Sequence, residues 1–373
     1  MGPSRQFCPN FYCPHRGKPG LGNIKVHSRK GRRFRCLACG RTFAATRNTP
    51  FYRRHKPLEL VTAVTALLTH GRPLQAIVAA FALDERTVAA WQLQAGQHAR
   101  RFHQLHVQQG RVDAQHVQAD ELYVKMVGRR LWLALALAVP TRLWLGGALS
   151  RRRDLRLITA LVVVVRSCLR SLAILVCVDG LASYIRAFVS AFRHKVQGAR
   201  GRPRLVVEAG LLIGQVVKRY SGRRLTAVVR RAARGSLEAV AEVLWRTGTG
   251  TGINTSYIER LNATFRACLT GLVRRGRALL HQEGRMEAAV YLVGCVYNFC
   301  REHDSLRAAA PPGAGRKWAG RTPAMAAGLT DHVWSLAELL GWRVVPAVWK
   351  APRKQPRRRR RRATNPAPTT AAA

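Results

Sequence analysis

Two apolar segments of this chain each contain an aspartate, and these two positions constrain what the chain can fold into. Asp120 lies within the strand-like segment 116–124. Asp179 lies near the end of a second such segment, 172–180. A carboxylate inside a buried segment is costly unless it is paired or binds a cation. The chain has only 18 Asp and Glu among its 373 residues, so we interpret the two aspartates as functional.

A third acid, Glu259, lies in a segment with helical periodicity that begins at Ser256. Each acid taken alone has a simpler explanation. Asp120 suits an exposed edge strand, and Asp179 precedes a glycine and suits a turn. Glu259 could pair with a neighbouring arginine on a solvated helix face. The combination of the three favours a common site.

Other acids also have positions that allow them to join such a site, namely Glu121, Asp154 and Glu208. Glu121 competes directly with Asp120. Because side chains alternate along a strand, we expect these two neighbours on opposite faces, so that only one of them belongs to the site. We prefer Asp120, on the basis of the family resemblance described below.

The order of the predicted elements narrows the fold class. Three strand-like runs come first, separated by turn-forming sequences, and a helix, a strand, a helix, two short strands and two long helices follow. This is the order of a ribonuclease H-like α/β fold, a mixed sheet with helices on both faces. The predicted strands are 112–127, 131–139, 142–149, 172–179, 205–207 and 215–220, and the predicted helices are 152–166, 184–194, 256–280 and 286–303.

In such a fold the middle of the first strand lies beside the end of the fourth, which would place Asp120 next to Asp179. Glu259, on a helix that crosses the sheet edge, can complete the cluster. Three carboxylates can hold two divalent cations ~4 Å apart. Oxygen ligands favour Mg²⁺ or Mn²⁺ over zinc. The sequence therefore predicts a two-metal phosphoryl-transfer site.

Four of the nine cysteines lie within the first 39 residues, in a region with few apolar side chains. Cys8 and Cys13 form one pair, and Cys36 and Cys39 form a second. Two such pairs match one tetrahedral structural Zn²⁺ site of the zinc-ribbon type. His15 could replace Cys13 as a ligand, and four free thiols are the alternative. We favour zinc because this region has no other evident source of stability.

Residues 57–99 have helical periodicity interrupted by turns. A short helix at 74–81, a tight turn and a longer helix at 85–99 form a helix-turn-helix pattern, for which a plain three-helix bundle is the alternative. We predict that the longer helix binds in the DNA major groove through Arg86 and Thr87, near its N-terminus.

A net charge of +46, from 64 Lys and Arg, predicts a polyanionic partner. We expect double-stranded DNA, bound by a homodimer or a higher oligomer. An anionic membrane surface is the alternative, but no clean amphipathic helix accompanies the charge. No signal peptide or membrane-spanning segment is evident, so we expect a cytoplasmic, nucleoid-associated protein. The basic segment 353–362 is predicted to be disordered and to bind polyanions without sequence preference.

Three segments resemble the sequences around the catalytic acids of bacterial DDE transposases of the insertion-sequence-one type. They are 119–123, 178–184 and 254–266, the last of them followed by a basic run at 272–277. The resemblance extends over most of the chain, because the N-terminal cysteine pairs are similar to the zinc-finger region of that family. Two features depart from the family: the first cysteine pair is unusually wide, and both halves of a protein that is often split over two reading frames lie on one chain.

The resemblance implies that Asp120, Asp179 and Glu259 are the catalytic acids and that they bind two Mg²⁺ or Mn²⁺ ions. It leaves the segment 223–252 without a recognisable motif. The residues that it implies as DNA contacts beside the metal site are Arg260, Asn262 and Arg266.

We therefore expect a transposase that binds the inverted-repeat ends of a mobile DNA element and catalyses strand cleavage and strand transfer. The alternatives are a metal-dependent nuclease of the same fold and a non-catalytic DNA-binding regulator. The predicted organisation is a zinc-ribbon module at 1–50, a helix-turn-helix domain at 51–110, a catalytic domain at 111–307, a linker with a small helical segment at 308–350 and a disordered basic tail at 351–373.

Overall fold

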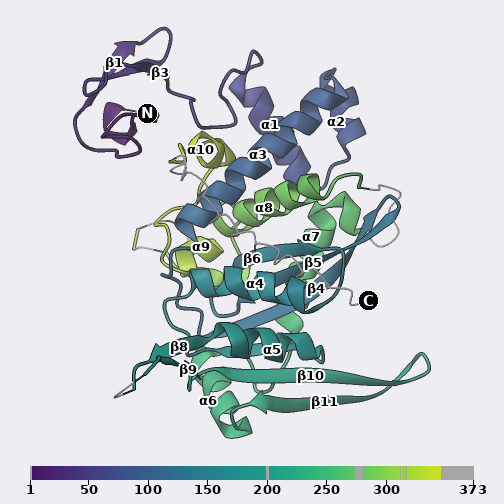
Figure 1. Ribbon diagram of the computed structural model, residues 1–373. Coiled ribbons are helices and arrows are strands. Elements are labelled where there is room, and N and C mark those ends of the chain that lie inside the picture. Colours follow the sequence, from purple (N-terminus) through teal and green to yellow (C-terminus); the bar gives the residue numbers. More distant parts are fainter. Residues whose placement is uncertain are drawn as a thin grey trace, which may run out of the picture.

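The chain is a mixed α/β protein built around one six-stranded mixed sheet (Figure 1). The computed structural model describes residues 2–345 except 199–200, 274–279, 311, 314 and 316. The predicted basic tail therefore lies outside the described residues. In Figure 1 the N-terminal segment lies at the top, a helical layer lies beneath it, and the sheet lies below the helices. No helix in the described part of the chain is long and apolar enough to cross a membrane.

The central sheet has the strand order β11-β10-β7-β4-β5-β6. β4 pairs antiparallel with β5 and parallel with β7, and β7 pairs parallel with β10. The outer pairs, β5 with β6 and β10 with β11, are antiparallel. The predicted adjacency of the two strands that carry the aspartates is confirmed. The strands are β4 (His116–Met126), β5 (Arg129–Ala138), β6 (Leu143–Ser150), β7 (Leu175–Asp179), β10 (Leu212–Ser221) and β11 (Arg224–Arg234).

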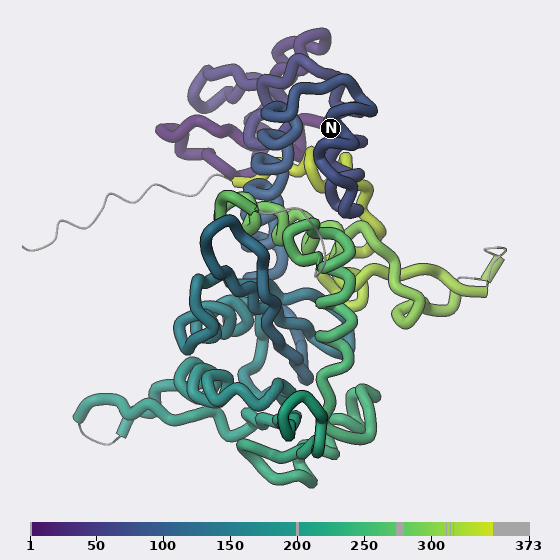
Figure 2. The backbone as a smooth tube through the Cα atoms, turned by 90° about the vertical axis from the view of Figure 1, so that its right-hand side faces the viewer, coloured from purple at the N-terminus to yellow at the C-terminus, as the bar shows by residue number. Residues whose placement is uncertain are grey.

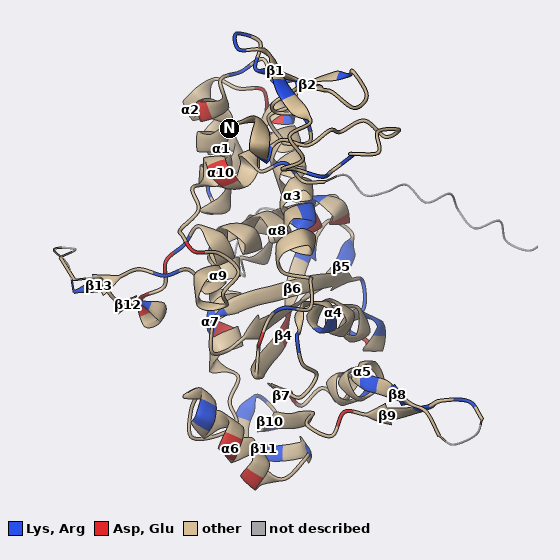
Figure 3. Cartoon of the chain, turned by 90° about the vertical axis from the view of Figure 1, so that its left-hand side faces the viewer, with Lys and Arg blue, Asp and Glu red and all other residues tan. Residues whose placement is uncertain are grey.

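Helices cover both faces of the central strands. Side chains from Leu133 to Val139 are almost fully shielded from solvent, which explains why this run is continuously apolar instead of alternating. Figure 3 shows α7 on one side of β4 and β7, with α4 and α5 on the other. The helices around the sheet are α4 (Leu155–Cys168), α5 (Ala182–Ala191), α7 (Ser256–Cys268) and α8 (Glu283–Phe299).

The N-terminal helices share their core with the sheet. The third of them extends to His106 instead of ending near residue 99, because its second half packs closely against α8. Gly96 permits this approach, since a Cβ atom there would collide with the backbone of Ala288. One hydrophobic core extends from Phe51 to Val344, so no break in the core occurs at the predicted boundary near residue 110. The helices are α1 (Leu58–Thr69), α2 (Leu74–Phe81) and α3 (Glu85–His106).

The cysteine-containing segment forms a small three-stranded antiparallel sheet with its own core. Besides cysteines, the buried apolar side chains of this core are Ile24, Phe34 and Phe43. Arg343, from the far end of the described chain, attaches this module to the rest by donating to the side chain of Gln6 at 2.6 Å. The elements of the module are a 3₁₀ helix η1 (Pro3–Arg5) and the strands β1 (Ile24–Ser28), β2 (Arg33–Cys36) and β3 (Thr42–Ala44).

The helix predicted at 256–280 is shorter than expected. α7 ends at Cys268 because Leu269 adopts an extended backbone, with φ −125° and ψ 107°. A 3₁₀ helix, η2 (Thr270–Leu272), follows and buries Leu272 in the core. Residues 274–279, which hold most of the basic run of the family resemblance, lie outside the described residues.

Several elements occur where the sequence predicted a different one or none. The segment 223–252 contains β11 and α6 (Leu237–Thr247). The strand expected at 205–207 pairs with β8 in a separate hairpin, and the expected linker contains another hairpin, β12 with β13. Figure 2 shows these two hairpins projecting on opposite sides of the molecule. The remaining elements are β8 (Arg193–Val196), β9 (Arg204–Val207), η3 (Asp304–Leu306), β12 (Ala308–Ala309), β13 (Trp318–Ala319), α9 (Pro323–Ala326) and α10 (Leu336–Gly341).

Candidate metal centres

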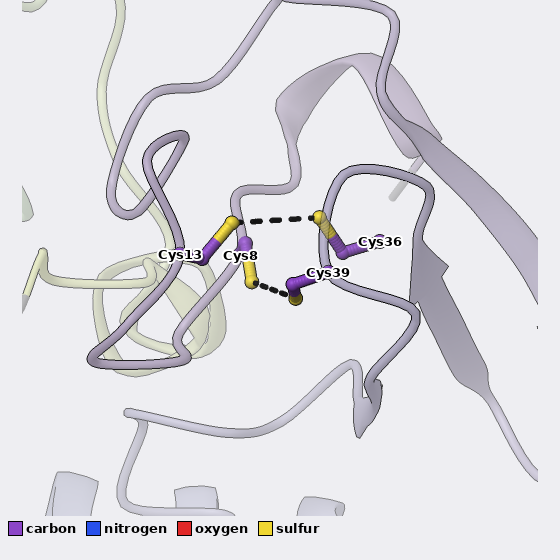
Figure 4. Close-up of side chains that lie close together, drawn as sticks. All are labelled: Cys8, Cys13, Cys36 and Cys39. Atoms are coloured by element: carbon purple, nitrogen blue, oxygen red, sulfur yellow. Dashed lines mark hydrogen bonds between the residues drawn. The ribbon is translucent and has the colours of Figure 1, made fainter.

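The four cysteines predicted as zinc ligands converge on one point (Figure 4). Cys8 Sγ lies 3.6 Å from Cys39 Sγ, and Cys13 Sγ lies 3.8 Å from Cys36 Sγ. All four sulfur atoms lie within 4.8 Å of one another. Zn–S bonds of ~2.3 Å in a tetrahedron place the sulfur atoms ~3.8 Å apart, so this arrangement could hold a zinc ion. The alternative ligand, His15, does not belong to the group.

Local backbone geometry positions the second cysteine pair. Gly40 has a φ of 69° and donates its N–H to the carbonyl of Cys36 at 2.8 Å. Glycine adopts such a positive φ without steric cost, so the chain can turn back directly after the last cysteine. The first pair lies in an irregular loop, in which Gly17 donates to the carbonyl of Cys8 at 3.1 Å. The wide spacing of this pair does not keep Cys13 away from the cluster.

A second cluster consists of carboxylates on the central sheet. Asp120, Glu121 and Asp179 offer oxygen atoms that all lie within 4.8 Å of one another. The parallel ladder between β4 and β7 ends at the pair Gln118 and Cys177. Asp120 and Asp179 each follow that pair by two residues, and this brings them together at the point where the two strands separate.

Glu121 also belongs to this cluster, contrary to the expectation that Asp120 and Glu121 exclude each other. The alternation itself is confirmed, because Asp120 faces Asn262 of α7 whereas Glu121 faces Tyr184 of α5. Both side chains nevertheless reach one cluster, because Asp179 lies beyond the last ladder pair, at a strand end. A carboxylate at that point can be approached from both faces of the sheet.

An arginine bridges two of these carboxylates. Arg153 Nη2 lies 3.2 Å from Glu121 Oε2 and 2.8 Å from Asp179 Oδ2. The guanidinium also lies over the ring of Trp132, 5.5 Å from its centroid. Arg153 comes from the loop between β6 and α4. Its positive charge offsets part of the repulsion between the acids.

The other two acids that the sequence allowed into the cluster have different partners. Asp154 is the N-cap of α4, where its carboxylate accepts from the N–H groups of Arg156 and Leu157 at 3.1 Å each. Glu208 Oε2 lies 3.6 Å from Nδ1 of His194 in β8. Neither acid belongs to the carboxylate group.

Burial makes the two carboxyl groups of β4 difficult to ionise. Burial, reinforced by the carboxylates of Asp179 and Glu259, raises the pKa of Asp120 to about 6. Burial, and next the charge of Asp179, raises the pKa of Glu121 to about 7. The Glu121 side chain is 0% exposed, and its Oε1 atom has no hydrogen-bond partner among the described residues. Such a group of acids favours a bound proton or cation.

Two buried amides hold α7 against β4. Gln118, 0% exposed, accepts at Oε1 from the N–H groups of Tyr257 and Ile258, at 3.0 Å each. These bonds satisfy the first turn of α7 and fix its position on the sheet. Asn262, 1% exposed, donates from Nδ2 to Asp120 Oδ2 at 2.7 Å. The expectation that Asn262 contacts DNA does not fit this burial, and its contact instead orients Asp120.

Asp120 and Asp179 line a surface cavity, which we call the acidic cavity. Glu259 lines this cavity too but stands apart from the three-carboxylate cluster. Its side chain is 54% exposed, and its Oε1 atom lies 3.7 Å from Lys218 Nζ. The Oε1 atom also accepts from the hydroxyl of Thr255 at 3.1 Å. The cavity has a volume of about 560 Å³. Residues that line it include Asp120, Arg153, Asp179, Lys218, Tyr220 and Glu259.

The residues predicted to contact DNA occupy different positions. Arg86 is exposed in the first turn of α3, where Thr87 donates its N–H to the N-cap carboxylate of Asp84 at 3.1 Å. Arg260 is exposed on α7 and is not among the residues that line the cavity. Arg266 is half-buried in the last turn of the same helix.

Arg153 and Gln118 had no sequence signal strong enough to identify them. Arg153 is one of 64 basic residues, and Gln118 is one polar side chain in an apolar run. No protein-family model matches this chain, and no curated protein matches it. A proposal for the function therefore depends on the sequence motifs and on the geometry of the two candidate metal centres.

Proposed function

We propose that this protein is a DNA transposase of the DDE class that cleaves and joins phosphodiester bonds at the acidic cluster. The observation that carries the proposal is the convergence of Asp120 and Asp179 from neighbouring parallel strands, with Glu259 lining the same cavity. The strand order β6-β5-β4-β7-β10, in which an antiparallel meander precedes two parallel strands, supports a ribonuclease H-like sheet. The high positive charge of the chain supports a polyanionic substrate.

The acidic cluster fits a hard divalent cation, because its donors are carboxylate oxygens. Two Mg²⁺ or Mn²⁺ ions held there would activate the attacking oxygen and stabilise the leaving oxygen of a phosphodiester. Residues of the chain prepare this site. Asn262 orients Asp120 through its 2.7 Å hydrogen bond. Arg153 holds Glu121 and Asp179 in place and offsets their charge until a cation binds.

The third carboxylate ligand has two candidates. Glu259 matches the family glutamate by sequence, and its exposed side chain can rotate from Lys218 toward the cluster. Glu121 is already in the cluster, but Arg153 occupies its Oε2 atom. We favour Glu259 as the ligand and assign Glu121 to holding Arg153. Substitution of each glutamate separates the two assignments, as described in the Discussion.

The N-terminal region is proposed to bind the ends of the mobile element. The four cysteines would hold one structural zinc ion in a zinc ribbon, and α2 and α3 would form the helix-turn-helix. The exposure of Arg86 in the first turn of α3 supports a recognition role. Figure 3 shows further Lys and Arg on the strands and loops of the cysteine-containing sheet.

The decisive experiment uses the full-length protein, Mg²⁺ and a labelled duplex that carries the terminal repeat flanking its gene. Nicking and strand joining are scored separately, and an Asp120→Asn, Asp179→Asn double variant is the control. Joined product that the double variant does not form supports a transposase. Hydrolysis without joining would instead identify a nuclease of the same fold. Sequence-specific binding with neither reaction, in Mg²⁺ or Mn²⁺, would identify a regulator.

A further inference from the structure

The strands β10 and β11 form a ribbon that extends beyond the central sheet (Figure 1). The two strands pair from Ile213 and Arg234 out to Ser221 and Arg224. The neighbouring strand β7 accompanies β10 only as far as Val216. Beyond that point the ribbon has two strands, and both of its faces are largely exposed.

The composition of this ribbon is unusual even for a basic protein. Residues 212–234 contain no Asp or Glu. Three large apolar side chains are exposed on it, namely Tyr220 at 59%, Leu225 at 47% and Val228 at 38%. Figure 3 shows basic residues on both strands. The Lys and Arg of the ribbon are Lys218, Arg219, Arg223, Arg224, Arg230, Arg231 and Arg234.

Stability accounts for only part of these features. Arg230 and Arg234 donate to the carbonyls of Ile253 and Leu211, and Arg231 donates to Gln215 Oε1, so these three arginines have structural partners at the base of the ribbon. A two-stranded ribbon is marginally stable in water, and exposed apolar side chains on it add little. Charges on an edge strand can prevent edge-to-edge association, and this would explain some of the arginines. It would not explain why the basic and apolar side chains continue onto the wall of the acidic cavity.

The ribbon and the acidic cluster share that cavity. Val217, Lys218 and Tyr220 line it together with the acids. Lys218 Nζ lies 3.7 Å from Glu259 Oε1. In the β10–β11 register Lys218 pairs with Val228, so these two side chains share a face of the ribbon. A polymer that places one phosphate near the acids can therefore continue along this face.

We propose that the β10–β11 ribbon is a DNA-binding arm that holds the duplex next to the scissile phosphate. The proposal rests on the function proposed above. The basic side chains toward the tip, Lys218, Arg219, Arg223 and Arg224, would contact backbone phosphates. A two-stranded ribbon has the width that the major groove of B-DNA admits. Lys218, which lines the cavity, exchanges its contact with Glu259 for a phosphate of the substrate. Tyr220 supplies an apolar contact to the DNA beside the cavity.

The position of the bound duplex on the ribbon is tested by photocrosslinking in the full-length protein. Tyr220 is replaced by p-benzoylphenylalanine, and the control has the same substitution at Trp245, which is 83% exposed on α6. A 40-bp labelled duplex is the probe, and the Asp120→Asn, Asp179→Asn background prevents cleavage. We expect a crosslink from position 220 and none from position 245. Equal crosslinking from both positions, or none from position 220, would overturn the proposal.

The contribution of the ribbon to DNA affinity is tested by the salt dependence of binding to the same duplex. The variant Arg223→Ala, Arg224→Ala removes two charges at the ribbon tip. Its matched control, Lys195→Ala, Arg204→Ala, removes two charges from the other exposed hairpin, β8–β9, which does not line the cavity. Each lost phosphate contact reduces the slope of log K against log salt by ~0.9, so we expect a reduction of ~1.8 for the ribbon variant and no change for the control.

These outcomes separate the arm from the proposed chemistry. If the ribbon variant behaves like its control, the arm is disproved even when the wild-type protein cleaves and joins DNA. If the crosslink and the slope change occur but no strand is cut in Mg²⁺ or Mn²⁺, the arm is supported and the proposed transposase activity fails. Circular dichroism melting curves that match the wild type show that each variant is folded.

Discussion

The two candidate metal centres differ in what surrounds their ligands. The cysteine cluster lies in a module whose core contains three other buried apolar side chains. The acidic cluster lies on a sheet whose core extends from Phe51 to Val344. Three of the four cysteines are buried, whereas the Asp179 side chain is 36% exposed to an open cavity. A closed site in a small module suits a structural ion, and an open site on a large core suits a catalytic one.

The comparison implies opposite energetic roles for metal ions bound at the two candidate centres. A metal ion bound in the cysteine module would contribute its binding free energy to folding, because the module has only a small core of its own. On the sheet an extensive core holds carboxylates close together at a cost. A cation there would relieve this repulsion and, in the proposed function, supply the chemistry. The following predictions test this contrast, from the largest expected effect to the smallest.

Removing one zinc ligand should unfold the N-terminal module and leave the sheet intact. Structural zinc sites bind with an apparent ~10–16 kcal/mol, far more than the small core of the module can replace. We expect Cys36→Ser to lose its zinc in elemental analysis and to lose hydrogen-exchange protection at 24–44, with β4 and β7 unchanged. The matched control is Cys300→Ser, outside the cluster. Wild-type protein purified without chelator that contains no zinc, yet keeps this protection, would refute the assignment.

Removing one acidic ligand should have the reverse effect, with loss of chemistry and retention of folding. We expect Asp120→Asn and Asp179→Asn each to reduce DNA cleavage by ~10³-fold, because charge stabilisation in the transition state is lost. DNA binding should be nearly unchanged. Glu259→Gln should match these variants if Glu259 is the third ligand, while Glu121→Gln should retain more activity. The opposite ranking of the two glutamates would assign the ligand to Glu121.

The two centres should respond to pH in opposite directions. In the metal-free protein the pKa of Glu121 is raised to about 7, so between roughly pH 4.5 and 7 the folded state binds more protons than the unfolded state, and its stability falls as pH rises. The Glu121→Gln variant lacks this loss. Its free energy of unfolding relative to the wild type should therefore increase from pH 5 to pH 8 in chelator-treated samples. Zinc release from the cysteines should instead increase as pH falls, because thiolates become protonated.

The stability of the wild type has to be compared with that of the Glu121→Gln variant, because buried histidines change stability with pH in the opposite direction. Burial lowers the pKa of His98 to about 4 and those of His103 and His116 to about 3. Because of these histidines the protein loses stability as pH falls below their ordinary pKa. The loss is equal in the wild type and the variant, so it cancels when one free energy of unfolding is subtracted from the other. If the difference in free energy of unfolding between the two proteins does not change with pH, the ionised carboxylate of Glu121 does not destabilise the folded state.

The smallest expected effect concerns the amide that orients Asp120. Asn262→Ala removes the 2.7 Å hydrogen bond, and we expect the Mg²⁺ concentration for half-maximal cleavage to rise by ~10-fold, as is typical of residues that support metal ligands. Activity should recover at high Mg²⁺. The control is Asn298→Ala, which removes another buried amide. Asn298 bonds the backbone of Trp144, and neither residue lines the acidic cavity. If both variants require the same Mg²⁺ as the wild type, Asn262 has only a structural role.

Sequence patterns predicted the local parts of this protein. The helix at 74–81 has its predicted bounds, and the next helix begins at its predicted residue, Glu85. The cysteine spacing predicted a four-sulfur cluster, and the two apolar runs predicted strands that carry Asp120 and Asp179. Each of these predictions depends on side chains within a few residues of one another, where periodicity and capping chemistry act directly.

Only the tertiary structure decided which distant groups meet. The contact of Asn262 with Asp120 joins residues that are far apart in the chain, as does the bridge that Arg153 makes to Glu121 and Asp179. Whether Glu121 joins the acidic cluster depends on where the β4–β7 ladder ends. The long strand β11 depends on its pairing with β10. Register, ladder length and helix position are set by the packing of the whole core, so no local pattern of residues contains them.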